Sequence, residues 1–187
     1  MKKKFSISQT AIFSLALVVV FGLSLLTSCE FFQKTGLHLI SGGEGLTIES
    51  LDGKAYISDA KKTFRYIDAY FENWRLNHSG PATAETIVDV NEIVKDGTFV
   101  QIFTEINSDL DKIAMTQAQI IRFCEKYPTW LSQGRYATFF LTKVDSKYFV
   151  IRVNRRDDAL DVNVRKFEII GAWNASYGRR IVSLQYE

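Results

Sequence analysis

The spacing of apolar residues changes from a helical period to a strand period at Gly134, and this change limits the possible folds more than any other feature of the chain. Between Thr98 and Tyr127, apolar residues recur every three or four positions, which places them on one face of a helix. After Gly134 they alternate with other residues, as in a half-buried strand. Helices followed by strands indicate an α+β fold, with helices packed on one side of an antiparallel sheet.

Three strands are expected in the second half of the chain, at 137–141, 149–153 and 160–164. The connections at 145–146 and 155–159 are short and polar, so the strands should form an antiparallel meander with one buried face. A further strand is expected at 181–186.

Two capping boxes predict where the central helices begin. Thr98 and Thr116 are each followed three residues later by a glutamine, the spacing at which two side chains cap each other's backbone amides. The apolar stripe of the first helix continues to Ile113, so one kinked helix and two short helices are both open. The second helix should end before Pro128, because proline cannot continue a regular helix.

The first part of the domain is expected to contain a hairpin, a helix and a strand. Asp52 and Gly53 separate two strand-like runs within 46–59, and this dipeptide favours a tight hairpin turn. Residues 61–77 carry aromatic side chains at helical spacing, which predicts an amphipathic helix. We interpret the aromatic stripe as core packing, with a membrane-resting or ligand-stacking surface as the alternative. Alternation over 85–95 predicts a strand.

Residues 1–29 have the three parts of an export signal: lysines at positions 2–4, an apolar stretch at 11–26, and the sequence Leu-Thr-Ser-Cys at 26–29. The last part resembles the lipobox of bacterial lipoproteins, in which an aliphatic and two small residues precede an obligatory cysteine. The resemblance implies cleavage before Cys29 and lipid on its thiol. The alternative is an uncleaved membrane helix, for which the apolar stretch is shorter than the roughly 20 residues needed.

A lipoprotein signal implies a place in the cell envelope, anchored to a membrane and facing the periplasm or the exterior. By the same resemblance, Glu30 rather than aspartate after the cysteine favours the outer membrane, in a cell that has one. Without its first 28 residues the 187-residue chain has the length of one domain. We therefore divide it into a signal peptide at 1–28, a lipidated cysteine with a flexible tether at 29–45, and one globular domain at 46–187.

A second resemblance concerns the domain itself. The stretches SDLDKIAMTQAQIIRFCEKYPTWL, GRYATFFL and KYFVIRV, with residues 173–182, are similar to a C-terminal region of small uncharacterised bacterial proteins. This resemblance covers about half of the chain. It implies that the region is a folded domain, but it does not indicate an activity.

Neither cofactor nor metal chemistry is indicated by the motifs, and no catalytic residue is predicted, because no dinucleotide, P-loop, zinc-protease, calcium-loop or paired C-x-x-C pattern occurs. The only cysteines are Cys29 and Cys124, which excludes a disulfide framework. Cys124 lies on an apolar helix face and is expected to be a buried thiol. A nucleophilic pair of Cys124 and His78 is the alternative.

Arginines on the C-terminal strands are the main candidate for binding. Arg152 and Arg165 share the outward phase of neighbouring strands, and we predict a binding site for an anionic partner that comprises Arg152, Arg155, Arg156, Arg165 and Tyr148. Arginine suits carboxylate and phosphate groups because its planar fork makes two parallel hydrogen bonds. The alternative is a solvated face in which arginines pair with nearby aspartates.

The expected function is that of a non-catalytic binding or accessory module. Its partners would be the membrane, through the lipid, and an envelope protein or an anionic envelope polymer. The three lysines of the signal account for more than the whole net charge of +2, so the rest of the chain is near neutral, at −1, and no nucleic-acid partner is expected. The alternative is an envelope enzyme that uses Asp157, Asp158 and Asp161 as acid and base.

Overall fold

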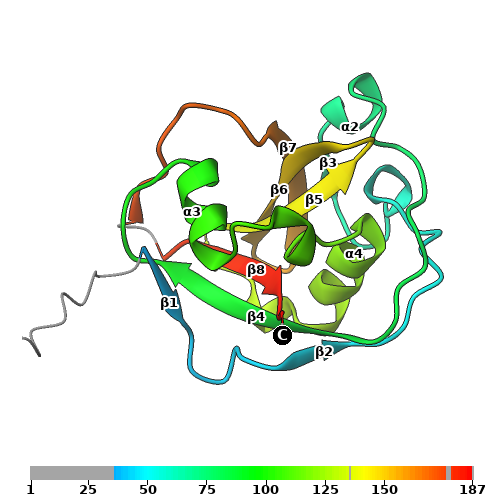
Figure 1. The fold of residues 1–187 in the computed structure, drawn as a ribbon. Helices are drawn as coiled ribbons and strands as arrows, with labels where there is room; N and C mark the ends of the chain where they lie inside the picture. The colour runs from blue at the N-terminus through cyan, green and yellow to red at the C-terminus, as the bar shows by residue number, and fades with distance from the viewer. Residues whose placement is uncertain (1–35, 135, 176–177, 187) are drawn as a thin grey trace, which may run out of the picture. The chain divides into compact units, whose positions relative to one another are not determined.

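The computed structural model describes residues 36–134, 136–175 and 178–186. The predicted signal, Cys29 and the first part of the predicted tether lie outside the described residues. The described part is built on a mixed sheet of eight strands, against which three short helices pack (Figure 1). Strand content is therefore higher than the predicted hairpin and meander would give. No helix in this part of the chain is long and apolar enough to cross a membrane.

Eight strands, three α-helices and three 3-10 helices make up the described elements. The strands are β1 (Leu37–Leu39), β2 (Leu46–Ile48), β3 (Tyr66–Ile67), β4 (Thr86–Ile93), β5 (Ala137–Val144), β6 (Lys147–Arg156), β7 (Ala159–Lys166) and β8 (Arg180–Leu184). The helices are α2 (Tyr70–Asn73), α3 (Phe99–Ile106) and α4 (Gln117–Lys126), with 3-10 helices η1 (Ile57–Asp59), η2 (Leu110–Lys112) and η3 (Pro128–Trp130). The strand order is β1-β4-β8-β5-β6-β7-β3, and β2 also pairs with β4.

Strands β5, β6 and β7 form the predicted antiparallel meander. Ile151 in the middle strand lies opposite Phe140 on β5 and Val164 on β7. The further strand predicted near the C-terminus is β8, which lies between β4 and β5, antiparallel to the former and parallel to the latter. The last strand in the sequence thus completes the middle of the sheet.

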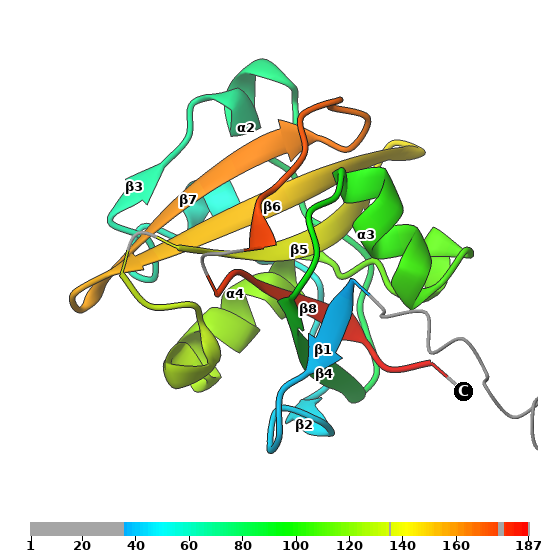
Figure 2. The ribbon, with the colours of Figure 1, turned by 90° about the vertical axis from the view of Figure 1, so that its left-hand side faces the viewer.

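Helices cover both faces of the sheet, not one as predicted (Figures 1 and 2). On the side that we call the α4 face, Phe123 of α4 packs with Phe140 and Ile151. On the opposite side, the α3 face, Phe103 of α3 shares a core with Phe139. The prediction failed because the adjacent residues Phe139 and Phe140 are both fully buried, so β5 has no solvent-facing side.

Helices α3 and α4 begin where the sequence predicted. Both capping boxes are present: the hydroxyl groups of Thr98 and Thr116 accept hydrogen bonds from the amides three residues later. Of the two alternatives for the first stripe, two short helices are correct. The backbone at Asn107 is extended, and a separate 3-10 helix, η2, follows with Asp109 as its N-cap.

The hairpin predicted at Asp52 and Gly53 is wrong. Strand β2 pairs with β4 instead, and Leu51 bridges to Thr83. Gly53 has a φ of +75°, and a Cβ atom there would lie 2.2 Å from the carbonyl oxygen of Pro81. This glycine therefore permits the close approach of two loops and does not form a hairpin turn.

The helix predicted over 61–77 is reduced to the single turn of α2. Before it, the amides of Arg65 and Asp68 donate hydrogen bonds to the carbonyl groups of Leu160 and Val162, so this segment joins the sheet as β3, parallel to β7. Phe64 and Phe71 of the aromatic stripe are buried. The helical spacing thus identified residues that face the core. The segment is not a long helix because part of its backbone bonds to the free edge of β7 instead.

The second half of the predicted tether is folded. β1 pairs with β4, with His38 opposite Glu92. The amide of Gly43 donates to the carbonyl oxygen of Ile40, and its own carbonyl accepts from Val90. Residues 36–45 therefore belong to the sheet-based unit.

Candidate functional site

Arg152 and Arg165 lie on the α3 face of β6 and β7. Arg152 is opposite Asn163 on β7, and Arg165 is opposite Val150 on β6. The same face is apolar at β5, where Phe139 lies opposite Arg152. The register therefore places polar side chains beside the buried apolar cluster.

Trp173 and a third arginine complete this polar region. The guanidinium carbon of Arg152 lies 5.6 Å from the centre of the Trp173 ring, and that of Arg179 lies 5.3 Å from it. Such contacts stabilise a cation through the negative face of the ring. We call Arg152, Arg156, Arg165 and Arg179 the arginine cluster.

Arg152 is the least compensated member of the arginine cluster. Its pKa is held below the ordinary value, first by partial burial and then by the positive charges of Arg165, Arg179 and Arg156. Its Nε atom is buried and has no hydrogen-bond acceptor among the described residues. Within the same residues, no carboxylate lies at ion-pair distance from its guanidinium group.

The neighbouring carboxylates are engaged by other arginines. Arg65 donates to both oxygens of Asp161 at 3.0 and 3.2 Å, and Arg156 lies 3.5 Å from the same group. Asp68 lies 3.5 Å from Arg165. Both aspartate side chains are nearly buried. The predicted pairing of arginines with nearby aspartates thus occurs at the edge of the cluster and does not extend to Arg152.

Arg155 and Tyr148, which were predicted to belong to the same site, lie elsewhere. Arg155 has the opposite phase on β6 and donates to the carbonyl oxygen of Pro128 at 2.9 Å. Tyr148 shares the α3 face, but its hydroxyl donates to Asp111 at 2.5 Å. It therefore belongs to a separate polar group with Lys143, which bonds the same carboxylate.

Trp173 was not identified as a site residue from the sequence. It lies outside the regular strands, and it exchanges backbone hydrogen bonds with Gly97, which is far away in the chain. Its ring packs against Phe99 and Phe139 at centroid distances of 5.2 and 4.9 Å. Such contacts join segments that are distant in sequence, so the local spacing of apolar residues does not predict them.

The three aspartates of the predicted acid cluster do not share one environment. Asp157 and Asp158 are exposed in the turn between β6 and β7, whereas Asp161 is buried and ion-paired. Asp157 has a φ of +52°, as a tight turn requires. Among the described residues, no group of three or more histidine, cysteine or acidic side chains could hold a metal ion.

Cys124 and His78 are not paired. Cys124 is buried in the core on the α4 face, and burial raises the pKa of its thiol far above the ordinary value. His78 is exposed, with its Nδ1 atom 3.2 Å from the carbonyl oxygen of Ser79. The thiol is therefore an unreactive core group.

Comparisons with protein-family models, with curated proteins and with solved structures find no match to this chain. The residues of this chain are therefore the only basis for inferring a function. Among the sites described above, the arginine cluster has the least compensated charge, that of Arg152.

Proposed function

We propose that this chain is a lipid-anchored protein of the cell envelope whose domain binds a carboxylate- or phosphate-bearing polymer through the arginine cluster. The anchor would be Cys29, as the lipobox-like residues before it imply. Two or three acyl chains hold a protein stably on a membrane. The domain would then act as a non-catalytic binding module.

The uncompensated charge of Arg152 carries the proposal. A partly buried guanidinium group with a buried, unbonded Nε atom and three arginines around it is unfavourable in the free protein. An anionic group that accepted its outer N–H groups would offset the repulsion and supply the missing negative charge. Trp173 would hold the guanidinium plane in place for this contact.

The alternative of an envelope enzyme built on Asp157, Asp158 and Asp161 has less support. Acid–base chemistry needs groups that converge on one reacting atom. Two of these aspartates are exposed in a turn, and the third is engaged by Arg65 and Arg156.

Binding is tested with Arg152→Met on the full-length protein, with polyglutamate and polyphosphate as the two anionic polymers. Arg155→Met is the matched control, because it removes the same charge from the other face of the same strand. We expect Arg152→Met to weaken binding by about tenfold or more while the control stays near the wild type. We also expect Arg152→Met to raise the free energy of unfolding, because it removes repulsion. Unchanged polymer binding in Arg152→Met would contradict the proposal.

The anchor is tested separately with Cys29→Ser. Metabolic labelling with a fatty-acid analogue should mark the wild-type protein and not the variant. Equal labelling of both proteins would refute lipidation at position 29 and leave the arginine cluster to be judged by the polymer experiment.

A further inference from the structure

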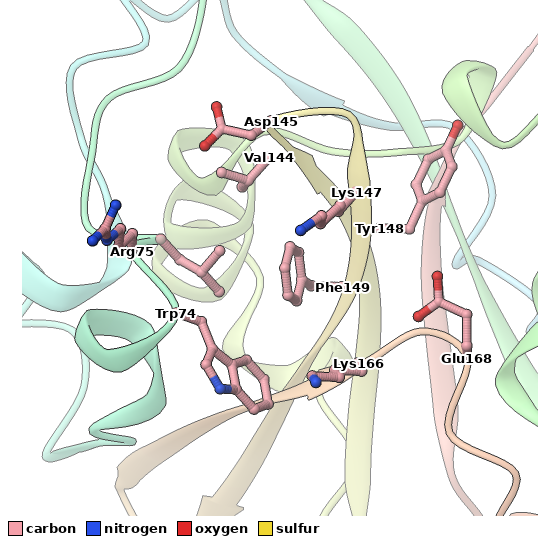
Figure 3. A pocket seen from close by; sticks show the side chains of 10 residues that line it. Trp74, Arg75, Val144, Asp145, Lys147, Tyr148, Phe149, Lys166 and Glu168 are labelled. Atoms are coloured by element: carbon pink, nitrogen blue, oxygen red, sulfur yellow. The ribbon is translucent and has the colours of Figure 1, made fainter.

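A hollow of about 580 Å³ lies on the α4 face, at the start of β6 and the end of β7, whereas the arginine cluster lies on the α3 face of the same strands (Figure 3). Its side chains come from three places: the turn between β5 and β6, the end of β7, and the residues after α2. We refer to it as the hollow and define it by Trp74, Arg75, Leu76, Lys147, Phe149 and Lys166. Its volume is in the range of small-molecule sites.

The inner surface of the hollow is apolar and held in place. Leu76 and Phe149 are buried. Trp74 stacks on Tyr70 with a ring separation of 4.7 Å and lies 6.0 Å from Phe149. These contacts fix an aromatic wall, which suits a flat apolar group.

Three cations surround this apolar surface: Arg75, Lys147 and Lys166. Within the described residues, none of them has a carboxylate at ion-pair distance. Lys166 has its Nζ atom 5.6 Å from the centre of the Trp74 ring. Figure 3 shows the amine of Lys147 directed toward the hollow.

The acidic side chains nearby do not neutralise these cations. Glu168 and Asp145 also line the hollow (Figure 3), but among the described residues neither carboxylate lies at ion-pair distance from Arg75, Lys147 or Lys166. By contrast, Lys143, on the same hairpin but on the α3 face, is paired with Asp111 at 2.7 Å. The unpaired cations are thus a feature of the hollow and not of this hairpin as a whole.

The backbone conformation of Arg75 is a second indication that this hollow has a function. Its φ is +57°, in the left-handed region that favours glycine. It follows α2 at the position where the next amide, that of Leu76, donates back to the carbonyl oxygen of Phe71 at 2.7 Å. Glycine is the usual residue at this point of a helix end, so an arginine there indicates a use for its side chain.

We propose that the hollow binds a small anion that carries a flat apolar ring, such as an aromatic carboxylate. The ring would lie against Trp74 and Phe149, and the anionic group would be held by Lys147 and Lys166 at the mouth. This site is separate from the arginine cluster and does not depend on the lipid anchor.

The test measures binding of 1-naphthoate, its neutral carboxamide and 1-naphthylmethylammonium to the full-length protein by calorimetry. We expect the anion to bind at least about tenfold more tightly than the neutral analogue, and the cation to bind least. The double variant Lys147→Gln with Lys166→Gln should lose about tenfold or more in affinity for 1-naphthoate. Arg75→Gly should also weaken binding, because it removes the third cation that lines the hollow. The same substitution should raise the melting temperature, because glycine adopts a positive φ without strain.

Two control variants test whether 1-naphthoate binds in the hollow and not elsewhere on the domain. Lys143→Gln removes a charge from the same hairpin on the other face, and Arg152→Met disables the arginine cluster; both should bind 1-naphthoate as the wild type does. Equal affinity for the three probes, no binding of 1-naphthoate, or loss of binding only in Arg152→Met would each overturn the proposal.

Discussion

The two faces of strands β6 and β7 have opposite compositions. Toward α4, Ile151, Val153, Val162 and Val164 are fully buried in an apolar core. Toward α3, the intervening positions hold Arg152, Asn154, Asp161, Asn163 and Arg165. From Ile151 to Asn154 on β6 and from Asp161 to Arg165 on β7, each step of one residue thus exchanges an aliphatic side chain for a polar or charged one.

This difference assigns stability and the proposed binding to opposite faces of the same strands. The apolar face contributes burial that involves no charged group, so it does not change with pH. The polar face holds a charge that the free protein compensates poorly, which is expected where a ligand supplies the missing partner. Substitutions on the two faces should therefore differ in size, in salt dependence and in their effect on ligand binding.

The largest effect is expected from Phe103→Ala in α3. This ring is fully buried and packs against Phe99 and Phe167 at centroid distances of 6.4 and 6.3 Å. Its loss should lower the free energy of unfolding by about 3–5 kcal/mol, measured by urea denaturation. A loss below about 1 kcal/mol would contradict a core role for Phe103 on the α3 face.

A smaller effect is expected from Asp161→Asn on the polar face. The substitution leaves Arg65 and Arg156 without the carboxylate that they share. We expect a loss of about 1–3 kcal/mol, since a nearly buried charged hydrogen-bond acceptor is removed. Asp158→Asn, in the exposed turn, is the matched control and should change stability by less than about 0.5 kcal/mol. If the two variants behave alike, the ion pairs of Asp161 do not stabilise this face.

The polar face could be predicted from the sequence only in part. The phase of Arg152 and Arg165 follows from alternation along two adjacent strands, and the structure places them on one face. The contributions of Trp173 and Asp68 could not be predicted, because these residues come from irregular segments. Backbone hydrogen bonds hold Trp173 to Gly97 and Asp68 to Val162 of β7, which are both far away in sequence. The hollow likewise joins residues after α2 to a hairpin far along the chain.

The helices and strands that were predicted correctly are those set by local sequence, and those that were missed depend on partners far away in the chain. The meander has short connections and a local period of two, so its strands could be read directly. Strands β2 and β3 are three and two residues long and pair with β4 and β7, so their positions depend on partners far away in sequence. The capping boxes of α3 and α4 are local, which is why both helix starts were predicted correctly.

Substitutions at the N-caps of α3 and α4 compare how much each helix, one on each face of the sheet, contributes to stability. Thr116→Ala and Thr98→Ala each remove a hydroxyl group that accepts from a backbone amide. We expect each to lower the free energy of unfolding by about 1 kcal/mol. If both losses appear in a single unfolding transition, the two covers belong to one cooperative unit. Local fraying of α3 alone, detected by hydrogen exchange, would show that the α3 face opens independently.

The smallest effect is expected at the exposed rim of the α3 face, where Asp111 bonds Lys143 and Tyr148. Hydrogen bonds from these two side chains lower the pKa of the Asp111 carboxyl below its ordinary value of 3.8. Because the folded pKa is the lower one, the stabilisation is present above the ordinary value and is lost as the pH falls through the folded value. The bond to Asp111 raises the pKa of Lys143, so that contribution is lost instead at alkaline pH.

Asp111→Asn should therefore lower the melting temperature slightly at neutral pH, and the difference from the wild type should disappear in strong acid and in high salt. Thermal unfolding at neutral pH and at a pH well below the ordinary aspartate value measures this. Screening should weaken the rim contact more than the ion pairs of Asp161, because the side chain of Asp111 is 56% exposed and that of Asp161 only 12%. Added salt should therefore affect Asp111→Asn more than Asp161→Asn. Equal salt dependence of the two variants would mean that water reaches both sites alike. In that case, burial would not account for the difference between the centre of the polar face and its rim.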